Sequence, residues 1–315
     1  MNPDQNIPTG LETKEEGPKI KIKIFFSGHV DAENAKAAIE DFKECDIFIP
    51  ESVGWDLKEK EQWNSLSTGK INPERFIQQS EPNFPDFTLA QSKIIHNSGK
   101  PIFFIDLPEG HAIIKEIDEI MEFYPDQLKT AQNFNDVFSI YKGCFLRISE
   151  LIKQREEIIV NSLPLQVASF LEENPDYKKK KELNVLIQLG SGHTPVFHTL
   201  KAKEVSVQRK VQGPQFFGPL GEIVRRIAFG KEVPQDLIAQ SILHNFIQTP
   251  LEEAMNSMKP QEASMLYDKI SDFVRRFNYK EIENIIRDGK DLEGLKKRII
   301  EMCVSKNLEI PEFLK

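Results

Sequence analysis

Two histidines follow apolar segments of the chain in the same local pattern. His193 follows the apolar residues 183–189 through the turn sequence Gly-Ser-Gly, and His29 follows residues 19–26 through Ser-Gly. Each histidine is therefore predicted to lie in a turn between a strand and a helix, at the carboxyl edge of a sheet, where open α/β proteins bind ligands. An imidazole can act as a base, stabilise charge or bind a metal, so two of them at one edge indicate a functional site.

A carboxylate and an arginine are expected at the same edge. Glu51 comes directly after the short apolar segment 46–50, which is typical of a strand. Arg155 falls on the apolar stripe of a predicted helix, three positions after Ile152 and four after Leu151. A buried guanidinium stays charged, so Arg155 is predicted to hold Glu51 or to anchor the carboxylate of a substrate.

These four residues allow two kinds of chemistry. His29, Glu51 and His193 could hold a divalent metal ion that activates water, with one coordination position left open. Without a metal, one imidazole could act as a general base oriented by a carboxylate, while the other stabilises developing negative charge. The sequence leaves both alternatives open, with Arg155 in a supporting role in each.

The elements that position these residues indicate an α/β protein with a mostly parallel or mixed sheet flanked by helices. The domain prediction is a flexible leader at residues 1–18, an α/β catalytic domain at 19–212, and a helical region at 213–315 that packs on it or caps it. A long helical pattern at residues 126–173, interrupted at Pro164, precedes the strand that leads to His193. Strands are predicted at residues 19–26, 46–50, 101–107, 183–189 and 204–208.

Composition limits the partners and the compartment. The 315 residues carry a net charge of −8, which argues against nucleic acid as the main partner. No apolar run approaches the roughly 20 residues that span a bilayer, and the first residues lack the apolar core of a signal peptide. The three cysteines have no metal-ligand spacing, so a reducing cytoplasm is predicted. The expected partners are a small-molecule or peptide substrate and, through the C-terminal helices, a second copy of the chain.

The arrangement resembles the superfamily that joins erythromycin esterases, the haem-uptake protein ChaN and the TraB/Tiki proteases. Its members carry two histidines after strands, the second in a G-x-x-H motif, which Gly190 to His193 matches. Glu51 matches their acidic residue after the second strand, and Arg155 matches their helical arginine. Phe26 stands where the first motif would have its glycine, and Glu156 stands where TraB/Tiki members tend to carry asparagine or aspartate.

This resemblance covers roughly residues 19–210 and implies a hydrolase of peptide or ester bonds. The enzyme would depend on a metal if it is closer to Tiki, and would be metal-free if it is closer to the esterases. The rival prediction is a non-catalytic protein that uses the pocket or the helical region to bind a partner or a small ligand. Binding of haem or a metal without turnover is a third alternative.

Overall fold

The structure is a computed structural model that describes residues 17–28, 32–82, 84–212, 218–289 and 292–314. It divides into two compact units: Met1–Ile114 with Gln154–Gln215, and Lys115–Lys153 with Phe216–Lys315. The long helix α7 (Phe134–Glu173) gives its first half to the second unit and its second half to the first. The segment Lys115–Lys153, expected within the α/β domain, thus belongs with the C-terminal helices. Most of the predicted leader, residues 1–16, lies outside the described residues.

The first unit is α/β and contains a four-stranded parallel sheet in the order β2-β3-β1-β4. In β1, exposed or half-buried residues at the start, where lysines alternate with isoleucines, give way to buried ones at the end. Ser27, the last residue of β1, pairs with Gly190, the last residue of β3. The carboxyl ends of the two central strands therefore lie side by side. The strands are β1 (Lys19–Ser27), β2 (Ile47–Ile49), β3 (Glu182–Gly190) and β4 (Val207–Val211).

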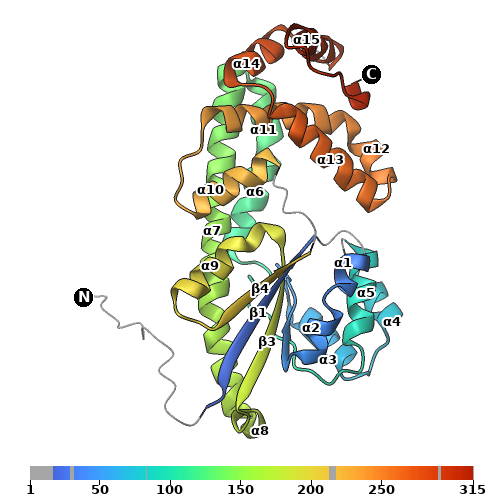
Figure 1. Cartoon of the computed structure of the whole chain (residues 1–315), viewed down its shortest axis with the longest axis vertical. Coiled ribbons are helices and arrows are strands. Elements are labelled where there is room, and N and C mark those ends of the chain that lie inside the picture. The colour runs from blue at the N-terminus through green and yellow to red at the C-terminus, as the bar shows by residue number, and fades with distance from the viewer. Residues whose placement is uncertain (1–16, 29–31, 83, 213–217, 290–291, 315) are drawn as a thin grey trace, which may run out of the picture. The chain divides into compact units, whose positions relative to one another are not determined.

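Helices cover the two faces of this sheet with separate apolar clusters (Figure 1). On one face, Ile24 and Leu189 pack with Ile159 of α7 and Val196 of α9. On the other face, the helices between β1 and residue 95 lie against the sheet. The helices of this unit, besides α7, are α1 (Ala32–Lys36), α2 (Ile39–Glu44), α3 (Leu57–Ser67), α4 (Pro73–Ser80), α5 (Pro85–Ile95), α8 (Pro175–Lys178), the short η1 (Ser191–His193) and α9 (Thr194–Ala202).

The third predicted strand, residues 101–107, is wrong: the structure has only isolated bridges there, Phe48 to Ile102 and Trp55 to Pro108. The amide of Phe48 donates to Pro101 and the amide of Phe103 donates to Phe48, so a parallel ladder begins. In this register the next donor on the β2 side would be Pro50, which has no amide hydrogen. The ladder therefore stops, and the segment continues without regular pairing.

Other boundaries also differ from the sequence prediction. The helical pattern at 126–173 is divided between α6, which ends at Thr130, and α7, which begins at Phe134. The last strand begins at Val207 rather than at residue 204, because Glu204 adopts a left-handed conformation (φ 59°) and the amide of Val205 donates to Leu200. These residues close the end of α9 and cannot start a strand. Pro164 does not interrupt α7, since buried Leu163 and Val167 hold the helix on both sides of it.

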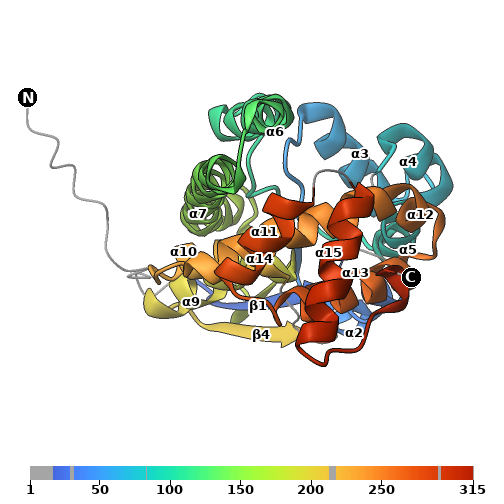
Figure 2. The ribbon, with the colours of Figure 1, turned by 90° about the horizontal axis from the view of Figure 1, so that it is seen from above.

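The second unit is helical, as the C-terminal sequence pattern predicts, and it has an apolar core of its own, which was not predicted (Figure 2). Buried Phe138, Ile242, Ile270, Ile285 and Ile299 belong to a single apolar cluster, contributed by α7, α11, α13, α14 and α15. The unit contains most of α6 (Ala112–Thr130), the first half of α7, α10 (Pro219–Ala228), α11 (Gln235–Gln248), η2 (Thr249–Leu251), α12 (Glu252–Ser257), α13 (Pro260–Val274), α14 (Tyr279–Asp288), α15 (Leu292–Ser305) and η3 (Glu312–Leu314).

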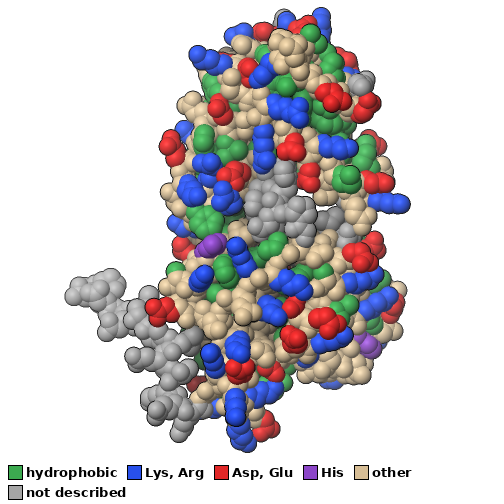
Figure 3. Space-filling view, viewed as in Figure 1, with side chains coloured by type: hydrophobic (Ala, Val, Ile, Leu, Met, Phe, Trp, Pro, Cys, Tyr) green, Lys and Arg blue, Asp and Glu red, His purple; other side chains and the backbone are tan. Residues whose placement is uncertain are grey.

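The surface mixes charges of both signs. On the face shown in Figure 3, lysine and arginine side chains alternate with aspartate and glutamate over both units. Among the described helices, none combines the length and the apolar character that crossing a membrane requires.

Candidate functional site

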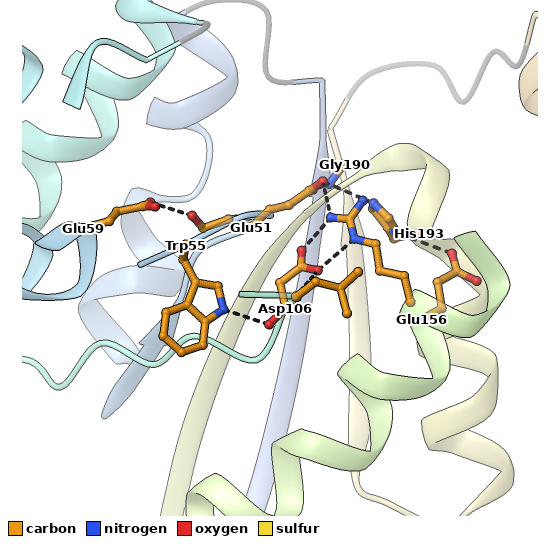
Figure 4. Close-up of polar contacts among 10 residues, drawn as sticks. Glu51, Trp55, Glu59, Asp106, Glu156, Gly190 and His193 are labelled. Carbon is orange, nitrogen blue, oxygen red and sulfur yellow. Dashed lines mark hydrogen bonds and ion pairs between the residues drawn. The ribbon is translucent and has the colours of Figure 1, made fainter. Parts of the chain in front are cut away.

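The candidate site lies in the α/β unit, where β2 and β3 end. β2 ends at Ile49, and Glu51 follows two residues later; β3 ends at Gly190, and η1 then carries His193 into α9. Because parallel strands end at one edge, Glu51 and His193 meet although they are far apart in the sequence. Figure 4 shows both side chains, together with Asp106 and Glu156, converging on this edge.

The chain leaves the two central strands toward opposite faces of the sheet. After β1 it forms α1 and α2, and Phe42 of α2 packs with Phe25 on one face. After β3 it forms α9, and Leu200 packs with Leu189 on the other face. Such a change of direction between neighbouring strands opens a crevice at their carboxyl ends, the usual ligand position in open α/β sheets.

His193 is buried between two carboxylates. Its side chain is 11% exposed, its Nε2 lies 3.2 Å from Oε1 of Glu51, and its Nδ1 lies 3.4 Å from Oε1 of Glu156. The second contact is a charge pair, because neither atom has a hydrogen-bond partner among the described residues. Burial alone lowers the pKa of His193, but Glu156 and Glu51 outweigh it and raise this pKa to about 9. His193 is therefore a charged imidazolium at neutral pH.

Arg155 meets the carboxylates that its buried position requires. Its Nε donates to Oδ1 of Asp106 at 2.8 Å and one terminal nitrogen donates to Oδ2 at 2.5 Å, a bidentate pair. The same terminal nitrogen lies 3.4 Å from Oε1 of Glu51. Arg155 was predicted to hold Glu51 or a substrate carboxylate; in the structure its main partner is Asp106, and Glu51 is a second, more distant one.

Gly190 allows the carboxylate of Glu51 to approach the end of β3. The amide of Gly190 donates to Oε2 of Glu51, and a Cβ placed on Gly190 would lie only 3.2 Å from that oxygen. Any larger residue would thus push Glu51 away from the backbone. The glycine of the G-x-x-H motif has a direct structural reason here.

The cluster holds three carboxylates and two cations, largely out of water. The side chains of Asp106, Glu156, Arg155 and His193 are at most 13% exposed, while that of Glu51 is 18% exposed. Glu51 contacts both cations and also lines an adjoining pocket of about 520 Å³. It is thus the link between the ionic cluster and the space where a ligand could bind.

Three of the four predicted site residues, Glu51, Arg155 and His193, come together in this cluster. The fourth, His29, lies outside the described residues; Ser27, two positions before it, ends β1 beside Gly190.

The sequence prediction missed Glu156, which it noted only as a departure from the family pattern, and gave Asp106 no defined role. The sequence did contain a sign of each residue: Glu156 lies next to Arg155, and Asp106 follows an apolar segment.

The described residues do not fit a metal centre. Within them, no group of three histidine, cysteine, aspartate or glutamate side chains is arranged to hold a metal ion. Both ring nitrogens of His193 face carboxylates, so a metal ion would have to replace one of these two contacts and a ring proton. The predicted ligand set also includes His29, so metal binding stays a prediction.

Comparisons with family models, with curated proteins and with solved structures find no match to this chain. The resemblance to the erythromycin esterase, ChaN and TraB/Tiki superfamily thus rests on the residues quoted for it.

Proposed function

We propose that this protein hydrolyses an amide or ester bond, with the reaction centred on Glu51 and His193. The proposal rests on one observation: Glu51 pairs with His193 and Arg155 and also lines the pocket. The class of bond comes from the family resemblance. It agrees with a site that combines a carboxylate base with fixed positive charge.

In the proposed reaction, Glu51 takes a proton from a water molecule as its oxygen attacks the carbonyl carbon. The positive charge of His193, whose ring nitrogens face Glu51 and Glu156, stabilises the negative charge that develops on the carbonyl oxygen through the electrostatic field of the site rather than through a direct hydrogen bond. His193 keeps its proton throughout. Glu51 then passes its proton to the leaving oxygen or nitrogen as the carbon–oxygen or carbon–nitrogen bond breaks. Arg155, held by Asp106, positions Glu51, and no step requires a metal ion.

The high pKa of His193 supports one of the roles that the sequence left open for it, the stabilisation of negative charge. An imidazole that stays protonated to about pH 9 cannot accept a proton at neutral pH. His193 therefore supplies charge stabilisation, and the base is Glu51. A role for His29, as a second base or a ligand of a metal, remains a prediction of the resemblance.

The test is hydrolysis by the full-length protein of a panel of aryl esters, alkyl esters and N-acyl amino acid amides, followed by mass spectrometry. We expect Glu51→Gln to lower kcat by about 10²-fold or more, as removal of a general base does. His193→Asn should lower it by a similar factor through the lost charge. Glu61→Gln, which removes an exposed carboxylate of α3 away from the pocket, is the matched control. Turnover that survives Glu51→Gln would refute the proposal. The metal alternative is tested by measuring hydrolysis after treatment with a chelator and by measuring it in the His29→Ala variant.

The alternative function is a non-catalytic protein that binds a ligand or partner. It is favoured by the extent of pairing: both nitrogens of His193 face carboxylates, and Arg155 is held by two. Such mutual neutralisation also suits a cluster that only fixes the strand ends. In that case none of the esters and amides in the panel would be hydrolysed, while Glu51→Gln would still lower the unfolding free energy.

A further inference from the structure

The pocket beside Glu51 has a composition that defines a ligand class. It lies at the carboxyl end of the sheet, against α3, α4 and α5, and has a volume of about 520 Å³. Its described lining includes five carboxylates and one lysine. The carboxylates belong to Glu51, Asp56, Glu59, Glu81 and Glu109, and the lysine is Lys58.

Gln188, one of the residues that line this pocket, carries a buried polar group without a partner among the described residues. It belongs to the buried strand β3, is 2% exposed, and its Oε1 accepts from Nε2 of Gln91 at 2.9 Å. Its own Nε2 has no hydrogen-bond partner among the described residues, although Gln188 and Gln91 both line the pocket. A buried donor without a partner costs roughly 1–3 kcal/mol, so an acceptor from a ligand would recover that cost.

The charge and the aromatic side chains of the pocket favour a cation. Three of these carboxylates already have partners: Glu51 pairs with Arg155 and His193, Asp56 caps α3, and Glu59 accepts from Ser52 and Trp63. The pocket nevertheless has an excess of negative charge, because Lys58 is the one cation among its described lining residues. A pocket with charges of one sign concentrates ligands of the other sign. Phe84, which is 50% exposed, also lines the pocket, where its ring can pack against an organic cation.

We propose that this pocket binds an organic cation that also carries a carbonyl oxygen. The carbonyl oxygen accepts from Nε2 of Gln188, the positive group lies among the carboxylates, and the apolar body packs on the aromatic rings. As a statement about substrate, the inference rests on the proposed hydrolysis, because Glu51 borders the same space. As a statement about binding, it is tested without any turnover.

The experiment uses three probes with the same aromatic body and carbonyl group but different charge. These are phenylalaninamide, a cation; N-acetylphenylalaninamide, which is neutral; and N-acetylphenylalanine, an anion. Binding to the full-length protein is measured by calorimetry and by saturation-transfer NMR at pH 6, where the α-amino group of phenylalaninamide is protonated. We expect the cation to bind at least tenfold more tightly than the neutral probe, and the anion to bind more weakly still.

Two variants test the pocket itself. Gln91→Met with Gln188→Met removes both partners of the buried pair, which should leave the fold intact and weaken binding of the cation at least tenfold. Glu109→Gln should weaken the cation several-fold and the neutral probe little, with Glu61→Gln as its control. The melting temperature of each variant reports folding.

Each result decides the inference. Equal binding of the three probes, binding of none, or full binding by the folded double methionine variant would overturn it. Selective binding of the cation supports it even if no ester or amide is hydrolysed, in which case the proposed function fails alone. Hydrolysis without a preference for cationic substrates would support the proposed function and contradict this inference.

Discussion

Nε2 of His193 lies 3.2 Å from Oε1 of Glu51, although 142 positions separate the two residues in the chain. The end of β2 brings the carboxylate to the end of β3, and Gly190 leaves it room to approach. This pair defines the electrostatics of the site, because it couples the charge of a buried imidazole to a carboxylate that faces the pocket.

The pair predicts the effect of Glu51→Gln on the titration of His193. The substitution keeps the shape of the side chain and removes its charge. Burial lowers the pKa of His193, and Glu156 and Glu51 together raise it to about 9, so without Glu51 the pKa should move back toward 6.5. Heteronuclear NMR of the imidazole rings measures this shift, with His193→Asn to identify the signal among the six histidines. An unchanged titration in Glu51→Gln would show that the two side chains do not interact in solution.

The raised pKa of His193 also predicts how stability depends on pH. The folded protein holds this proton more tightly than the unfolded chain does, so protonated His193 adds to the unfolding free energy. This contribution is complete below about pH 6.5 and is lost as the pH rises through about 9. At about 1.4 kcal/mol per pKa unit, the loss is of the order of 3 kcal/mol. Urea unfolding at several pH values between 6 and 10 measures it. The His193→Asn variant should lack this part of the slope, and parallel profiles for the two proteins would contradict the prediction.

The bidentate pair of Arg155 with Asp106 predicts a strong dependence of stability on both residues. Arg155→Met leaves the carboxylate of Asp106, which is 3% exposed, without its cation, and should cost roughly 3–5 kcal/mol in unfolding free energy. Arg155→Lys keeps the charge but loses the two-pronged geometry, so its cost should be smaller.

The matched test is the double variant Arg155→Met with Asp106→Asn. Removing the second charge should restore a large part of the loss, because the pair contributes less than the isolated buried charge costs. Denaturant unfolding of the four proteins gives the coupling energy. Additive losses would mean that the two side chains act independently.

The sequence predicted the core of this arrangement because its signals are local. The apolar runs of β1 and β3, and the turn after β3, depend on neighbouring residues, so their positions were found nearly to the residue. The arginine was found because an isolated charge on an apolar stripe must be paired. The edge segment at residues 101–107 was mistaken for a strand because one proline on its neighbour, Pro50, ends the ladder, and only the register reveals that.

The partners of the cluster could not be predicted in the same way. Arg155 and Glu156 are adjacent on α7 and so point in directions about 100° apart around the helix. Which of them meets Asp106 and which meets His193 depends on how α7 and α9 pack on the sheet, information that no local pattern contains. The orphaned amide of Gln188 is likewise visible only once α5 places Gln91 beside it.

The close approach of Glu51 to the backbone predicts a sharp difference between two glycines of one turn. In Gly190→Ala, the new Cβ would lie 3.2 Å from Oε2 of Glu51, whereas a Cβ on Gly192 would meet nothing within 4 Å. Neither glycine has a positive φ, so alanine fits the backbone at both positions and only the contact differs. Alanine at a compatible position stabilises a protein by roughly 0.4–1 kcal/mol through the unfolded chain, so Gly192→Ala should be neutral or slightly stabilising. Gly190→Ala should be less stable than Gly192→Ala by about 1 kcal/mol in unfolding free energy, because the carboxylate of Glu51 must shift to make room. It should also shift the His193 titration toward lower pKa, because Glu51 is displaced from the ring. Urea unfolding and NMR titration of the two variants provide the comparison, and equal behaviour of the pair would show that Glu51 does not rest against Gly190.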